Sequence, residues 1–149
     1  MHRADQIIDA IVSAVAGQVS DTGVHVFAHR RLLLEVEQDE LPAISVDFGQ
    51  DERAETVIIG KLGSLLTVET TAVVARPDET EAKQELLNLR AEIHKAIMSA
   101  PRLGMPAFVV DTLYAGANPP EYDTEGDLIV GTYTSLWQVY YTMNSADPT

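Results

Sequence analysis

The feature that most constrains this chain is a long run rich in threonine and valine between Leu65 and Ala75. Alternate residues of this run form one largely apolar face, as in a strand with one side against a core. The residues of this face are Leu66, Val68, Thr70, Ala72 and Val74. A strand of this length suits an antiparallel sheet, so the sequence predicts a sheet built around it.

A second β-type run, from about Ile129 to Thr142, carries large side chains on both of its alternating faces. One face holds Tyr133, Trp137, Val139 and Tyr141, and the other holds Thr132, Thr134, Leu136 and Tyr140. Large residues on both faces indicate cover on both sides. We expect a helix of this chain on one side and a neighbouring subunit on the other.

Two amphipathic helices are expected, because apolar residues recur at three-to-four-residue spacing in two segments. The first segment is Arg3 to Ala16, with Gly17 as a C-terminal stop. The second begins after Asp78 and ends before Pro101. The apolar positions are Ile7, Ile8, Ile11, Val12 and Val15 in the first helix and Leu86, Leu89, Ile93 and Ile97 in the second.

Shorter β-type segments complete the pattern. They are Val24 to Phe27, the alternating stretch Ile44 to Phe48, and Val109 to Tyr114, and an acidic loop is expected over Glu121 to Asp127. The predicted fold class is α+β, with two helices packed on one face of a mostly antiparallel (mixed) β-sheet in a single domain over residues 1–149. Oligomerisation is the expected cover for the opposite face.

Charge and composition exclude several function classes. The chain has 23 acidic and 10 basic residues, a net charge of -13, and no cysteine. Phosphate binding depends on Lys and Arg, so we expect no direct nucleic-acid partner. No apolar run approaches the roughly 20 residues of a membrane helix, and the first five residues do not resemble a signal peptide. We therefore expect no membrane association, and no disulfide or cysteine-based metal site.

The acidic residues crowd into residues 35–55, where Arg53 is the single base. This segment could be a solvated acidic surface or a docking surface for another protein. Arg30 and Arg31 precede it and could pair with the acidic residues of a neighbouring subunit, or could both be solvated. Trp137 suits a core position as well as a binding position. The candidate interface residues are Arg30, Arg31, Glu35, Glu37, Asp39, Glu40, Trp137 and Tyr141.

No catalytic, cofactor or metal motif was found in the sequence. The histidines do not form a helical i,i+4 pair, and no serine lies in a Gly-x-Ser-x-Gly elbow. The Asp123, Glu125 and Asp127 cluster lacks the later glutamate of a calcium loop, which favours a solvated turn. The sequence therefore predicts no catalytic residue, no cofactor and no metal, and a protein that is not an enzyme.

The order of these features resembles that of phage tail terminator proteins of the minor tail protein U type. The resemblance is carried by the amphipathic start, the strand Leu41 to Val46, the long strand Leu65 to Ala75, the helix containing Leu89 to His94, and the C-terminal end. At that end lie Tyr114, the acidic turn Tyr122 to Asp127 and the strand through Trp137 to Met143. The stretch Asp51 to Lys61 and the pair Pro119-Pro120 match no feature of the family.

The resemblance implies a homohexameric ring that caps the tail tube, ends tube polymerisation and provides the surface for head-tail joining. Its implied partners are further copies of itself, the tail tube protein and a head-tail connector or neck protein. The implied location is the head-proximal end of the tail in the virion, after assembly in the host cytoplasm. Three alternatives stay open, of which two are a head-tail connector or neck protein and an acidic protein-binding adaptor unrelated to phage. A hydrolase with an unrecognised carboxylate pair is a third.

Overall fold

The computed structural model describes residues 2–28, 41–53 and 61–144, which form two helices and six strands. The elements in chain order are α1 (Arg3–Gln18), β1 (His25–Ala28), β2 (Ala43–Arg53), β3 (Lys61–Arg76), α3 (Glu79–Met98), β4 (Val109–Ala117), β5 (Glu121–Glu125) and β6 (Leu128–Asn144).

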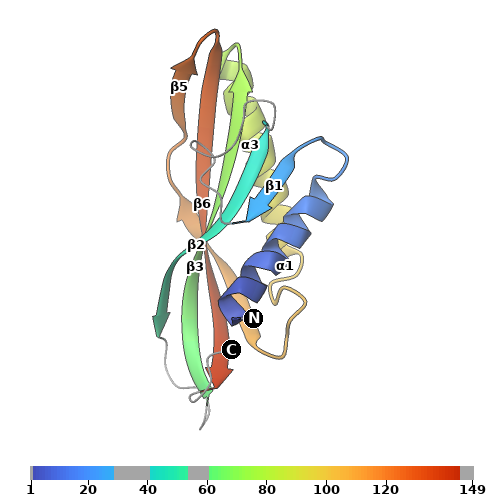
Figure 1. Cartoon of the computed structure of the whole chain (residues 1–149), viewed down its shortest axis with the longest axis vertical. Helices are drawn as coiled ribbons and strands as arrows, with labels where there is room; N and C mark the ends of the chain where they lie inside the picture. The colour runs from blue at the N-terminus through green and yellow to red at the C-terminus, as the bar shows by residue number, and fades with distance from the viewer. Residues whose placement is uncertain (1, 29–40, 54–60, 145–149) are drawn as a thin grey trace.

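All six strands belong to one twisted sheet with the order β1-β2-β3-β6-β4, and β5 also pairs with β6 (Figure 1). β1 and β2 are parallel, and every other pairing is antiparallel. Both helices lie on the same face of the sheet (Figure 1). The predicted fold class, two helices on one face of a mostly antiparallel mixed sheet, is confirmed.

The centre of the sheet is the pairing of β3 with β6, which runs from Lys61↔Asn144 to Arg76↔Ile129. At a rise of about 3.4 Å per residue this ladder is about 50 Å long. The 20-residue helix α3 spans only about 30 Å. One helix cannot cover such a ladder, and α1 packs beside α3 over the neighbouring strands β1 and β2.

Side chains cap the first turns of both helices. The Asp78 carboxylate accepts a hydrogen bond from the Thr80 amide at 3.1 Å, which satisfies a backbone donor at the start of α3. At the start of α1, His2 Nδ1 accepts one from the Ala4 amide at 3.1 Å. The prediction that Gly17 ends α1 is wrong. The helix continues to Gln18, and the Val19 amide still donates to the Val15 carbonyl.

The core lies between the helices and one face of the sheet. The predicted faces of β3 and of both helices are buried there, except that Val12 is only partly buried. The buried residues are Leu66, Val68, Thr70, Ala72 and Val74; Ile7, Ile8, Ile11 and Val15; Leu86, Leu89, Ile93 and Ile97. In β2, Ile44 and Val46 are buried, but Phe48 is 39% exposed. The register of β2 against β3 shifts between Phe48 and Asp51, so the regular alternation ends at Phe48.

The acidic segment after Pro120 is a strand, which corrects the predicted loop. Residues Glu121–Glu125 form β5, and they pair with β6 from Glu121↔Thr132 to Glu125↔Leu128. Gly126 makes the hairpin turn with φ 62°, a conformation that glycine adopts without strain. β4 pairs with β6 only as far as Ala117↔Ser135, so the remaining edge of β6 is available to β5.

Candidate interaction surfaces

Trp137 and Tyr141, two of the candidate interface residues, lie in the core of the single chain. They are 1% and 0% exposed, respectively. Trp137 Nε1 donates a hydrogen bond to Thr70 Oγ1 at 3.0 Å. The Tyr141 hydroxyl donates to Asp51 Oδ2 at 2.7 Å, and burial, together with this carboxylate, raises the pKa of Tyr141 well above its usual value. The core alternative for Trp137 matches this position.

The other six candidates lie outside the described residues. They are Arg30, Arg31, Glu35, Glu37, Asp39 and Glu40. Their pairing across a subunit interface stays a prediction.

A cluster of cationic and aromatic side chains joins α3 to the sheet. Arg90 Nη2 donates to the Tyr114 hydroxyl at 2.7 Å, and its guanidinium carbon lies 5.6 Å and 5.4 Å from the ring centroids of Tyr114 and Tyr133. The His94 ring lies 5.5 Å from the rings of both Tyr114 and Trp137. These cation–π and ring contacts fix Arg90 in one position at the surface of the helix layer.

Beside this cluster, α3 has a shallow hollow of about 330 Å³. Its lining is formed by Leu87, Arg90, Ala91, His94 and Lys95. Leu87 is 39% exposed, and Ala91, His94 and Lys95 are also exposed. The hollow therefore combines exposed apolar atoms with positive charge, although Lys95 Nζ lies 3.6 Å from Glu92 Oε1 at its edge.

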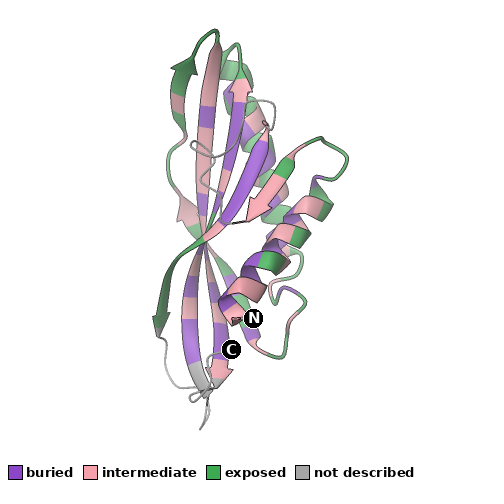
Figure 2. Ribbon diagram, in the orientation of Figure 1, coloured by how far each residue is buried: buried purple, intermediate pink, exposed green. Residues whose placement is uncertain are grey.

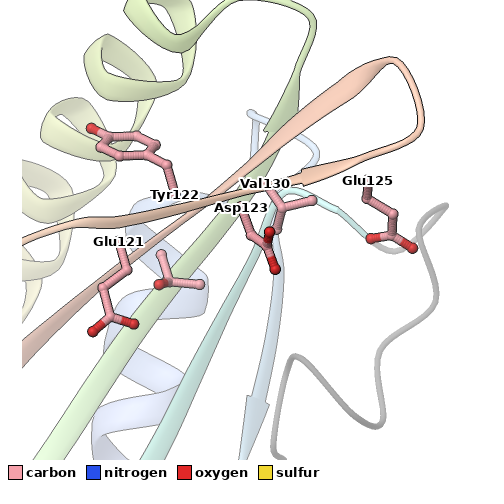
Figure 3. A pocket seen from close by; sticks show the side chains of 6 residues that line it. Glu121, Tyr122, Asp123, Glu125 and Val130 are labelled. Carbon is pink, nitrogen blue, oxygen red and sulfur yellow. The ribbon is translucent and has the colours of Figure 1, made fainter.

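A second hollow, of about 360 Å³, lies at the β5–β6 hairpin and is acidic. Its lining is formed by Glu121, Tyr122, Asp123, Glu125, Val130 and Thr132. In Figure 3 the Tyr122 ring points toward α3, whereas the side chains of Glu121 and Asp123 point to the opposite side of the sheet. Alternation along β5 places Glu125 on that side as well. Figure 2 shows β5 as mostly exposed.

The sheet face opposite the helices is partly exposed. On this face Thr71 Oγ1 lies 3.1 Å from Thr134 Oγ1, and Leu65, Leu136 and Tyr140 are each only partly buried. Among the described residues no helix covers this face. Next to it, the edge strand β4 exposes Val110 by 44% and Leu113 by 54%. Apolar side chains on an open edge strand are available for contact with another chain.

Within residues 2–28, 41–53 and 61–144, no group of three or more His, Asp or Glu side chains could hold a metal ion. None of the described helices is long and apolar enough to cross a membrane.

Comparison with known proteins gives a match of fold. No protein-family model and no curated protein matches the chain. Among solved structures, the chain is similar to one from the virion of a native gene transfer agent particle. The TM-score is 0.50 and the sequence identity 11%, and the match covers 91% of this chain and 93% of that one. At this identity the likeness shows a common fold over nearly the whole length.

The basic hollow on α3 was missed in the sequence analysis, although its signal is present there. Arg90 and His94, which line the hollow, and Lys83, which lies on the same side of the helix outside the hollow, recur at spacings of seven and four residues from Lys83 to Arg90 to His94. The acidic hollow could not be found in this way, because it requires the pairing of β5 with β6.

Proposed function

We propose that this chain is a structural protein of a phage-like virion that assembles into a ring, with six copies, at the head-proximal end of the tail. The ring caps the tail tube, ends its polymerisation and provides the surface on which the head is joined. Its partners are further copies of itself, the tail tube protein and a head-tail connector or neck protein. Assembly takes place in the host cytoplasm.

The observation that carries this proposal is the fold likeness to a virion chain. It extends over 91% of this chain and 93% of the other, so it concerns the complete arrangement of helices and strands rather than one common motif. The resemblance of the sequence to tail terminators supplies the finer role.

The surfaces of the chain support an assembling role. The sheet face opposite the helices lacks a helical cover among the described residues, and Val110 and Leu113 are exposed on the edge strand β4. Burial of such surfaces against identical copies removes apolar area from water, at about 25 cal/mol per Å².

Electron microscopy of the purified protein, alone and with tail tubes, tests the proposal. We expect closed rings of six subunits, bound at one end of each tube. In parallel, phage from which the gene is deleted should make tubes of uncontrolled length that do not join heads. Tails of normal length with heads attached would reject the terminator role, and a protein that stays monomeric with tubes present would reject the ring.

A further inference from the structure

The charges of α3 are separated onto two sides of the helix. With 3.6 residues per turn, Lys83, Arg90 and His94 fall within one sector of about 40°, and Glu81, Glu85 and Glu92 fall within another sector about 180° away. We call the residues of the first sector, with the adjoining Leu87 and with Lys95 of the same hollow, the basic flank; Lys95 lies about 60° around the helix from Glu92, with which it pairs at 3.6 Å. On the acidic side, Glu92 accepts a hydrogen bond from Gln18 of α1, and Glu85 pairs with Arg76.

Two of these acids, Glu85 and Glu92, therefore have partners within the chain, whereas Lys83, Arg90 and His94 lie on the opposite side of α3, away from α1. In the basic flank, Lys83, Leu87, His94 and Lys95 are exposed. Three of the ten bases of the sequence lie here, in a protein of net charge -13. Positive charge is concentrated on this surface although the chain as a whole is negative, which indicates a surface for an acidic partner.

The chain itself has an acidic surface that complements the basic flank in charge and resembles it in size. In the hollow at the β5–β6 hairpin, Glu121, Asp123 and Glu125 surround Val130 and Thr132, and its lining contains no base among the described residues. The basic hollow, similarly, has Leu87 and Ala91 between its cationic side chains. The two hollows have similar volumes, about 360 and 330 Å³, opposite charge, and some apolar surface at their centres.

The two hollows lie on opposite layers of the molecule. The basic flank belongs to the helix layer, whereas the acidic side chains point to the sheet face away from α3 (Figure 3). They cannot meet within one chain. A symmetric contact that places one hollow on its own copy would bring like charges together, so only a contact between unlike hollows is attractive.

We propose that copies of this chain join front to back, with the acidic hairpin hollow of one copy docked on the basic flank of α3 of the next. Such a heterologous contact generates a ring when the rotation closes, whereas a two-fold contact stops at a dimer. Leu87 and Val130 supply the apolar part of the contact. The inference rests on the proposed function, since it names the surfaces by which the ring forms.

Two charge-reversal variants test the contact. The flank variant is Lys83→Glu with Lys95→Glu, and the hairpin variant is Glu121→Lys with Glu125→Lys; all four side chains are exposed. Asp123 stays unchanged because its carboxylate accepts a hydrogen bond from the Thr124 amide at 2.8 Å. Arg90 stays because it holds Tyr114. Thermal melts establish that each variant folds.

Sedimentation velocity then measures ring formation by each variant and by their equimolar mixture. Each variant alone should form rings only at a protein concentration at least tenfold higher than the wild type needs, because its flank and hairpin now carry like charges. The mixture should return toward the wild-type value, because each flank again meets an opposite hairpin. The hairpin variant is decisive, since its net charge falls to -9 (-13 plus 4) and mean repulsion alone would make it assemble better.

A milder pair serves as a matched control. Two double variants are compared: the first is Lys83→Gln with Lys95→Gln, and the second is Ser20→Glu with Gln50→Glu. Each makes the net charge more negative by two units, but only the first changes residues of the flank. The first should weaken the ring more than the second. Variants that assemble like the wild type, or a mixture no better than its components, would overturn the contact while leaving the ring proposal intact. A wild type that forms no ring even on tail tubes would overturn both.

Discussion

Trp137 Nε1 donates a 3.0 Å hydrogen bond to Thr70 Oγ1, and both residues are buried. This bond crosses the central β3–β6 pairing. Thr70→Val should leave the indole N–H without an acceptor, and we expect it to lower the free energy of unfolding by about 1–3 kcal/mol. Urea unfolding followed by tryptophan fluorescence measures the change.

Thr112 in β4 provides the control for that substitution. Its hydroxyl is buried and has no hydrogen-bond partner within the described structure. Thr112→Val removes an unsatisfied polar group at similar volume, so the free energy of unfolding should stay the same or rise by about 1 kcal/mol. Equal losses for the two variants would contradict the roles assigned to the two hydroxyls.

Gly131 joins three elements through the absence of a side chain. A Cβ at this position would lie 2.9 Å from Leu86 Cδ1 of α3 and 3.3 Å from the Tyr122 ring of β5. Gly131→Ala should therefore overpack the site and lower stability by about 1–3 kcal/mol. Gly17→Ala, in helix α1 with nothing within 4 Å, should instead raise it by about 0.5–1 kcal/mol. Calorimetric melts of the two variants should shift in opposite directions.

Burial, reinforced by the hydrogen bond to Asp51, raises the pKa of Tyr141 above its ordinary value of about 10. The folded protein therefore keeps this proton at pH values where the unfolded chain releases it. Stability is unaffected below about pH 10 and falls above it, by up to about 1.4 kcal/mol per pH unit. Tyr141→Phe should be less stable at pH 7 but should lose stability less steeply above pH 10.

Urea unfolding from pH 8 to pH 11 measures both slopes for the Tyr141 prediction. Tyr122, whose pKa is also raised by burial, is unchanged in the variant, so it contributes equally to both proteins. Parallel slopes in the two proteins would contradict the assignment of the alkaline transition to Tyr141.

Salt should promote ring formation. Each copy carries a net charge of -13, and mean repulsion between copies is screened over about 10 Å at 0.1 M salt. The charge pairs between hairpin and flank are screened less because docking partly buries them, so added salt or divalent cations should mainly weaken the repulsion and shift monomers toward rings. A wild-type ring that dissociates as salt rises, in sedimentation velocity, would contradict the argument.

Arg30 and Arg31 give a separate test in the same salt series. If this pair meets the Glu35, Glu37, Asp39 and Glu40 segment of a neighbour, replacement of both arginines by alanine should weaken the ring at every salt concentration. An unchanged double variant would remove the pair from the interface and leave the basic flank of α3 as the cationic partner.

The sequence by itself determined the elements whose signals are local. The two-residue period of Leu66 to Val74 and the helical spacing of Leu86 to Ile97 each identify one buried face, because a repeating backbone geometry fixes which side chains share a side. The fold class followed from the order of these segments. The glycine signal at Gly17 ended the first helix too early, and the alternation of β2 failed at Phe48, next to a register shift.

Only the tertiary structure decided which distant segments pair and which side chains of different elements contact one another. The sequence predicted a loop for the acidic residues of β5, because nothing in that segment shows that β6 extends past β4 and has an edge open to pairing. Likewise, Arg90 donates its hydrogen bond to the Tyr114 hydroxyl, 24 positions away, only because α3 packs on the sheet. Periodicity describes a segment relative to its own axis, whereas strand pairing and layer packing relate segments distant in sequence. The opposite placement of the basic and acidic hollows is a property of that packing.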